Sequence, residues 1–303
     1  MWSTEAVPTI VLHREAKLTR ELKHARKVLR EHPSAIFGLG FLALVSLAAI
    51  FAPQLAPFDP EAADQARSLL PPSAQHWFGT DTNGMDIYSR ILWGGRVDLT
   101  IAVISSALGV TIGTVLGAYA GFHFGRRGPA ALASELLLRA TDSLQAFPIF
   151  VLALGLVAVL GRNIYDLLYA LVILFVPIFL RLARSSVIGA REETYVDAAR
   201  CSGSRSWRLV LLEILPNALT PSITNASVVA GSAVLVTAGL SFVGAGVPAP
   251  TPEWGSMIAV GAPNLYTGQW WPALVPGIVI GLVILSFALI GEAVAAYLDP
   301  NQR

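Results

Sequence analysis

The sequence predicts an all-α polytopic membrane protein with six transmembrane helices, and its composition and its uncharged runs carry this prediction. Of the 303 residues, 54% are hydrophobic and only 14% are charged, whereas a soluble domain carries about 25% charged residues. The apolar residues form uncharged runs long enough to cross a bilayer, for which about 20 residues are needed. The net charge of +1 gives no indication of nucleic-acid binding.

The uncharged runs place the six spans in order along the chain. The first run, Ala35–Ala52, ends in a proline-rich segment that stops a helix. A long basic segment precedes it, so it is expected to be a retained span rather than a signal peptide. The later spans are expected at Leu99–Phe122, within Ser143–Gly161, at Leu167–Leu180 with a continuation to Val187, at Ser222–Val243 and at Ala273–Ala293.

The distribution of lysine and arginine predicts the orientation of the spans. Counted over alternate loops, seventeen basic residues lie on one side of the membrane and four on the other. Because the basic side faces the cytoplasm, both termini are expected to be cytoplasmic. Residues 1–34 then form a basic arm, in which Leu18, Leu22, Ala25 and Leu29 share a helix face suited to the anionic lipid surface. Residues 35–303 form the six-helix domain, with outer loops at 58–96 and 246–271 and a cytoplasmic loop at 188–216.

The chain lacks the residue patterns of several other activities. All three lysines precede Gly38, the first glycine, so the Gly-rich turn followed by lysine of an ATP-binding P-loop cannot occur. The single cysteine, Cys201, excludes an internal disulfide framework, and the five histidines have no metal-ligand spacing. No nucleophile and base can be paired convincingly. We therefore expect no catalytic residue, no metal site and no cofactor in this chain.

Ionisable residues inside the spans would favour an ion-coupled transporter. The candidates are Asp142, Asp166 and Glu292, and each lies near the expected end of a span, where a carboxylate faces water or lipid headgroups. An ATP-independent secondary transporter or channel is therefore the weaker alternative. A scaffold or a membrane-embedded enzyme has no residues that favour it.

A polar segment interrupts the apolar sequence between the fourth and fifth spans. Asp197, Ala198 and Ala199 suit a short helix, and Gly203 permits the positive φ that ends it. Pro216 breaks the helical pattern that follows. The segment therefore predicts a helix–turn–helix on the cytoplasmic surface. Small alanines let another surface approach closely, which is the composition of a docking element rather than of an active site.

This spacing resembles the EAA loop of ABC importer permeases, in which Glu-Ala-Ala is followed by Gly and then by Leu-Pro. The matching residues are Asp197, Ala198, Ala199, Gly203, Leu215 and Pro216. Asp197 replaces the family's Glu and keeps its charge, and Glu213 replaces an Ile. The segments FGTDTNGMDIYSRILWGGR, DSLQAFPIFVLAL and GLSFVGAGVPAPTPEWGSM are similar to those of dipeptide, oligopeptide and nickel importers. Together they resemble the C-type permease subunit, although Met85 stands where the family has Arg.

The resemblance implies a type I ABC importer permease fold in a bacterial cell membrane. It implies three kinds of protein partner: a related B-type permease, ATPase subunits that hold ATP and Mg²⁺, and an extracytoplasmic solute-binding protein. The substrate is expected to be a di- or oligopeptide, with nickel or another small solute as the alternative. The residues expected to couple the chain to the ATPase are Glu193, Tyr195, Asp197, Ala198, Ala199, Gly203, Arg205, Leu215 and Pro216.

Two further sets of residues are expected to have roles inside the membrane. Uncharged polar residues of the fifth span would offer hydrogen bonds to a peptide, although serine and threonine in spans also join helices; they are Thr224, Asn225, Ser227, Ser232 and Thr237. A glycine at every fourth position of the second span favours close helix packing, either on the partner permease or within the chain. These glycines are Gly109, Gly113, Gly117 and Gly121.

Overall fold

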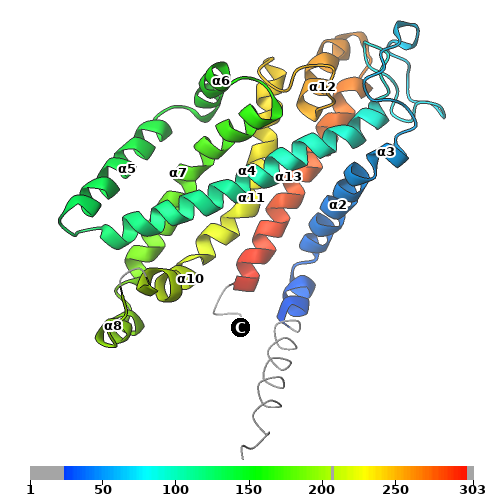
Figure 1. Cartoon of the computed structure of the whole chain (residues 1–303). Coiled ribbons are helices and arrows are strands. Elements are labelled where there is room, and N and C mark those ends of the chain that lie inside the picture. Colours follow the sequence, from blue (N-terminus) through cyan, green and yellow to red (C-terminus); the bar gives the residue numbers. More distant parts are fainter. Residues whose placement is uncertain (1–23, 206–207, 299–303) are drawn as a thin grey trace, which may run out of the picture.

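The computed structural model describes residues 24–205 and 208–298 of the chain, and these residues are mostly helical. Long helices lie side by side as a bundle, and shorter helices cover its two ends (Figure 1). The helices are α2 (Pro33–Ile50), α3 (Ala52–Leu55), η1 (Gln65–Arg67), α4 (Ile87–His123), α5 (Pro129–Gln145), α6 (Ile149–Leu160), α7 (Ile164–Ala190), α8 (Thr194–Cys201), η2 (Leu209–Ile214), α10 (Leu215–Ala218), α11 (Thr220–Phe242), α12 (Trp254–Gly261), η3 (Ala262–Thr267) and α13 (Trp271–Leu298).

Five helices in the described part of the chain are long and apolar enough to cross a membrane, namely α2, α4, α7, α11 and α13. They confirm five of the six expected spans. The second span starts earlier than expected, because α4 begins at Ile87 rather than near Leu99. Its 37 residues extend about 55 Å. This is more than the roughly 30 Å of the hydrocarbon core, so α4 is tilted or projects beyond it.

The third expected span, within Ser143–Gly161, is wrong as a single helix. Its residues are divided between the end of α5 and all of α6, and the two helices are bent by 101° relative to each other. Pro148 explains the break, because it has no N–H to donate and disfavours helical backbone at Phe147. Residues 24–205 and 208–298 therefore contain six candidate spans only if the bent pair counts as one of them.

The hydrophobic core lies where α4 packs against α7 and α11, and α13 packs on α11. The glycine stripe of α4 faces α7 of the same chain: a Cβ added at Gly113 would lie 2.6 Å from the Cβ of Phe179, and one at Gly121 would lie 2.8 Å from the carbonyl oxygen of Arg184. These glycines therefore pack within the chain, against α7. Their face of α4 is occupied by α7 and is not open to a partner permease.

The basic arm is described only from His24 onward, where a helical segment precedes α2. Leu18 and Leu22, which were expected on its apolar face, lie outside the described residues. The Nε2 atom of His24 lies 3.2 Å from the carbonyl oxygen of Tyr297 at the end of α13. In Figure 1 the start of the described chain and the end of α13 lie at the same end of the bundle as α8.

Candidate functional site

The EAA-like loop, residues 188–216, folds as α8, a turn, and the π-helical turn η2 leading into α10 at one end of the bundle (Figure 1). Glu193 is the N-cap residue of α8. Gly203 has a φ of +80° and follows the last turn of the helix. The N–H of Ser204 donates to the carbonyl oxygen of Ala199 at 3.2 Å and closes that turn. The helix and the glycine turn that the sequence predicts are both confirmed.

One face of α8 is anchored to the bundle. Val196 is fully buried in a small apolar cluster with Phe122 of α4 and Val187 of α7. Arg191, just before α8, donates from Nη1 to the carbonyl oxygens of Gly121 at 3.3 Å and Phe124 at 2.7 Å. The segment around α8 is therefore in direct contact with the ends of both α4 and α7.

The other face of α8 is open. Tyr195, Asp197 and Ala198 are exposed, and Asp197 accepts a hydrogen bond from Arg200 at 2.9 Å. Among the remaining residues expected to couple, Arg205 and Pro216 are exposed, whereas Ala199 and Leu215 are half-buried against the cluster around Val196. The expected coupling residues thus divide into an exposed set and a set that anchors the loop.

A basic hollow of about 460 Å³ lies between α8 and the turn after α4, and sequence reasoning missed it. Arg126, Arg191 and Arg200 line it together with Glu192 and Asp197. Burial, followed by the like charges of Arg200 and Arg191, lowers the pKa of Arg126 from its ordinary value. The concentration of positive charge suits an acidic surface. No sequence signal could have found it, because Arg126 joins the loop only in the folded chain.

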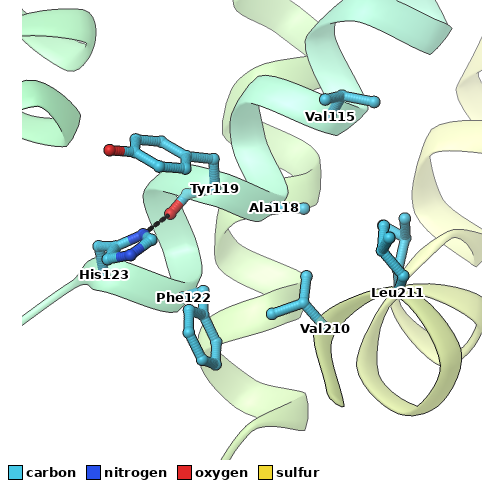
Figure 2. Close-up of a pocket in the computed structure, with 8 residues that line it drawn as sticks. Val115, Ala118, Tyr119, Phe122, His123, Val210 and Leu211 are labelled. Carbon is cyan, nitrogen blue, oxygen red and sulfur yellow. Dashed lines mark hydrogen bonds between the residues drawn. The ribbon is translucent and has the colours of Figure 1, made fainter. Parts of the chain in front are cut away.

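Beside this hollow lies an apolar cavity of about 400 Å³ between the end of α4 and η2 (Figure 2). Val115, Ala118 and Phe122 line it from α4, and Val210 and Leu211 line it from η2. Arg126 stacks on the ring of Phe122, with its Cζ 4.0 Å from the ring centroid. The contact between Phe122 and Arg126 therefore places the apolar cavity next to the basic hollow.

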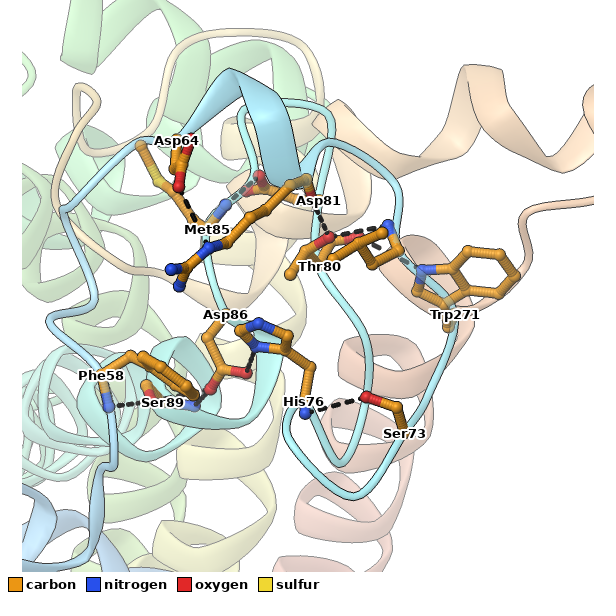
Figure 3. Close-up of polar contacts among 12 residues, drawn as sticks. Phe58, Asp64, Ser73, His76, Thr80, Asp81, Met85, Asp86, Ser89 and Trp271 are labelled. Atoms are coloured by element: carbon orange, nitrogen blue, oxygen red, sulfur yellow. Dashed lines mark hydrogen bonds and ion pairs between the residues drawn. The ribbon is translucent and has the colours of Figure 1, made fainter.

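At the opposite end of the bundle, the outer loop predicted at 58–96 folds as an ordered cap that ends at Asp86 (Figure 3). Asp86 caps α4: its Oδ2 atom accepts from the N–H of Ser89 at 2.8 Å, and its Oδ1 atom lies 2.9 Å from Nδ1 of His76. The indole of Trp271 donates to the carbonyl oxygen of Thr80 at 3.2 Å and ties the cap to α13. Residues 87–96, which were predicted to end the loop, form the first turns of α4.

The second outer loop, predicted at 246–271, contains α12, which lies across the start of α4. Trp254 is fully buried; its backbone N–H donates to Oδ2 of Asp98 and its indole N–H to the carbonyl oxygen of Ile91, both at 3.0 Å. Glu253 caps α12 by accepting from the N–H groups of the two residues after Trp254. Asp98 directly precedes the second span expected at Leu99–Phe122, and it is only 2% exposed because α12 covers it.

An ion pair between Asp142 of α5 and Arg181 of α7 lies on the face formed by α5, α6 and α7. Nη2 of Arg181 donates to Oδ1 of Asp142 at 2.6 Å. Asp142 was expected to be a helix-end group that faces water or lipid headgroups, and this partner was not predicted from the sequence. The sequence signal for this partner was Arg181, which directly follows the apolar run that ends at Leu180. A hollow of about 380 Å³ next to the pair is lined by Gln145, Phe147 and Pro177, among others.

The polar residues of α11 mostly bond within their own helix. Thr224, Asn225, Ser232 and Thr237 each donate to the carbonyl oxygen of the residue four positions earlier. Ser227 faces α13, where its Cβ lies 3.6 Å from the position of a Cβ added at Gly291. Thr237 is only 1% exposed and lies in the core of the chain.

Comparison with known proteins assigns the family. Residues 99–303 match the family model described as binding-protein-dependent transport system inner membrane component. Residues 21–72 match the N-terminal transmembrane domain of oligopeptide transport permease C.

Several relatives have peptide transport in their names, and three of them illustrate the similarity. The chain is 38% identical over 274 residues to a probable D,D-dipeptide transport system permease protein of Escherichia coli, covering 90% of each. It is 39% identical over 281 residues to a dipeptide transport system permease protein of Alkalihalophilus pseudofirmus, covering 93% of this chain and 90% of the relative. It is 36% identical over 288 residues to a di/tripeptide transport system permease protein of Pseudomonas aeruginosa, covering 93% of each. The chain therefore belongs to the family of inner-membrane components of binding-protein-dependent transport systems, the permease subunits of ABC importers.

Proposed function

We propose that this chain and a related second permease together form the path by which di- and oligopeptides enter the cell. The observation that carries the proposal is the near full-length match to three permeases whose names specify dipeptide or di/tripeptide transport. ATP and Mg²⁺ would be bound by separate ATPase subunits, because no P-loop occurs in this sequence. The chain itself would be a transport subunit without a catalytic residue.

Coupling to the ATPase would take place at α8, in the cytoplasm together with both termini. The excess of basic residues on that side supports this orientation. In the proposed mechanism, the exposed face around Tyr195 and Ala198 enters a groove of the ATPase, and closure of the ATPase pair moves α8. Val196 and Arg191 pass that movement to α4 and α7. Packed helices suit such a two-state movement, because they shift as rigid bodies.

The solute-binding protein would deliver its peptide at the opposite end, where the cap ending at Asp86 and the loop containing α12 lie. The peptide would then pass polar groups of α11. Thr237 is not part of this proposal because it is buried within the chain, which leaves Thr224, Asn225, Ser227 and Ser232.

Purification of the whole complex from cells that express the second permease and the ATPase subunits tests the coupling. Gly203→Pro forces φ to about −65° at a position where φ is +80°, and Asp197→Arg reverses a charge on the exposed face of α8. Both variants should lose the ATPase subunits or uncouple ATP hydrolysis from uptake. The control, Gly268→Pro, breaks a turn with a φ of +89° at the other end of the bundle and should keep the ATPase bound.

Uptake into proteoliposomes tests the substrate. With the solute-binding protein and ATP present, wild type should accumulate a labelled dipeptide. Accumulation of nickel without peptide would assign the alternative substrate. Uptake without any bound ATPase would reopen the secondary-transporter alternative.

A further inference from the structure

The Asp142–Arg181 ion pair involves α7, a helix long and apolar enough to cross a membrane. Arg181 stands 17 residues after Ile164, the first residue of α7, and therefore about 25 Å along the helix. The hydrocarbon core is about 30 Å thick. The pair joins two separate helices, α5 and α7, at 2.6 Å. It is therefore a feature of the transmembrane bundle rather than of a loop.

Neither side chain of this pair is covered by the rest of the chain. The side chain of Asp142 is 62% exposed and that of Arg181 is 53% exposed. Charged groups within a transmembrane segment face a water-filled cavity or another protein chain, because exposure to lipid is costly. The face of α5 and α7 that carries the pair thus borders either the transport path or the second permease.

Two hollows meet at Arg181. One, of about 380 Å³, is mostly apolar and is lined by Phe147, Pro177 and Ile178, with Gln145 at its edge. The other, of about 510 Å³, contains Asp142 and Arg184. The Oε1 atom of Gln145 and the Nε atom of Arg184 are buried without a hydrogen-bond partner. The site thus combines two opposite charges, spare hydrogen-bonding groups and an apolar hollow.

From this combination we infer, on the basis of the proposed function, that Asp142 and Arg181 bind the charged termini of a peptide inside the transport path. Arg181 takes the terminal carboxylate, for which its planar fork of donors is suited. Asp142 takes the terminal ammonium group, and the apolar hollow receives a side chain. When the site is empty, the two residues pair with each other.

Charge complementarity favours a peptide over the other solutes considered above. A free peptide carries one positive and one negative terminus, which match the two residues. A nickel ion would be repelled by Arg181, and a neutral solute would leave both charges without a partner.

Binding of a labelled dipeptide to the purified permease–ATPase complex, without the solute-binding protein, tests this inference. Wild type should bind the free dipeptide at least tenfold more tightly than the same dipeptide with an amidated carboxyl terminus or an acetylated amino terminus. Arg181→Gln should abolish the discrimination against the amidated peptide and keep that against the acetylated one. Asp142→Asn should do the reverse. A purely structural ion pair would not separate the two termini.

A matched control is available on the same helix. Glu135 and Arg139 form an ion pair at 2.7 Å within α5, and Glu135→Gln and Arg139→Gln should leave both discriminations unchanged. Retained discrimination in Arg181→Gln and Asp142→Asn, or absence of peptide binding to wild type, would overturn the inference. If the inference fails in this way but wild type still takes up peptide, the proposed function stands. If wild type takes up no peptide, both the inference and the proposed function are rejected.

Discussion

Gly113 of α4 lies so close to α7 that a Cβ added to it would stand 2.6 Å from the Cβ of Phe179 and equally close to the carbonyl oxygen of Val176. Both neighbours are fixed by the backbone of α7, so neither can move aside as the end of a flexible side chain would. This close contact between α4 and α7 therefore depends on the absence of a methyl group at Gly113. Close approach through small residues is how helices associate in lipid.

Gly113→Ala should destabilise the chain. Overpacking costs about 1–3 kcal/mol, which exceeds the gain of about 1 kcal/mol in helix propensity. The thermal unfolding midpoint of the purified complex should fall. Gly281→Ala in α13 is the control, because a Cβ there would meet nothing within 4 Å. An equal or higher midpoint for Gly113→Ala would show that α4 and α7 are not in contact at this glycine.

Features set by local sequence could be predicted. The uncharged runs located α2, α7, α11 and α13, because a bilayer selects for apolar length. The turn at Gly203 was also predictable, since a positive φ favours glycine. The break at Pro148 also has a local signal, the proline itself, but this residue lies inside an uncharged apolar run that predicts a single span. A proline can be tolerated within a transmembrane helix, as Pro177 is in α7.

Features that join distant residues could not be predicted in the same way. Asp98 and Trp254 are 156 residues apart, and burial of Asp98 depends on α12 folding back over α4. Arg181 and Asp142 are 39 residues apart on helices whose relative placement depends on the bend at Pro148. The glycine spacing predicted close packing, but the identity of the neighbouring helix required the structure.

Trp254→Phe should loosen α12 from α4. The indole lies on Gly94 and Gly95, where added Cβ atoms would stand 3.0 and 3.2 Å from its ring, and its N–H bonds to the carbonyl oxygen of Ile91. The smaller ring removes this hydrogen bond, worth about 1 kcal/mol, and leaves a void. The thermal midpoint of the complex should fall. Trp270→Phe, at a side chain that is 48% exposed, should have little effect, and equal effects of the two variants would contradict the prediction.

Val196→Asp should detach α8 from the bundle. The side chain is fully buried among apolar residues such as Phe122 and Ile214, where an unpaired carboxylate is strongly disfavoured. Less peptide should enter proteoliposomes for each ATP hydrolysed, even where the ATPase stays bound. Thr194→Asp is the control, because this residue is exposed in the first turn of α8, where a negative charge suits the helix dipole. Normal uptake by Val196→Asp would mean that the anchor is not needed for coupling.

Arg191→Gln should weaken transmission between α8 and α4 without removing the docking face. Nη1 of Arg191 donates to the carbonyl oxygens of Gly121 and Phe124 at the end of α4. Hydrogen bonds from charged groups contribute about 1.5–3 kcal/mol each, and a shorter neutral side chain loses them. The ATPase should therefore co-purify and hydrolyse ATP, while peptide uptake per ATP falls at least tenfold, because the loss of even one such bond, about 1.5 kcal/mol, corresponds to a factor of about ten. Arg162→Gln is the matched control, since Arg162 donates to the carbonyl oxygen of Gly244 at 3.1 Å near the other end of the bundle. If Arg191→Gln and Arg162→Gln lower the uptake ratio equally, α4 does not receive the movement of α8 through Arg191, and Val196 alone would carry it.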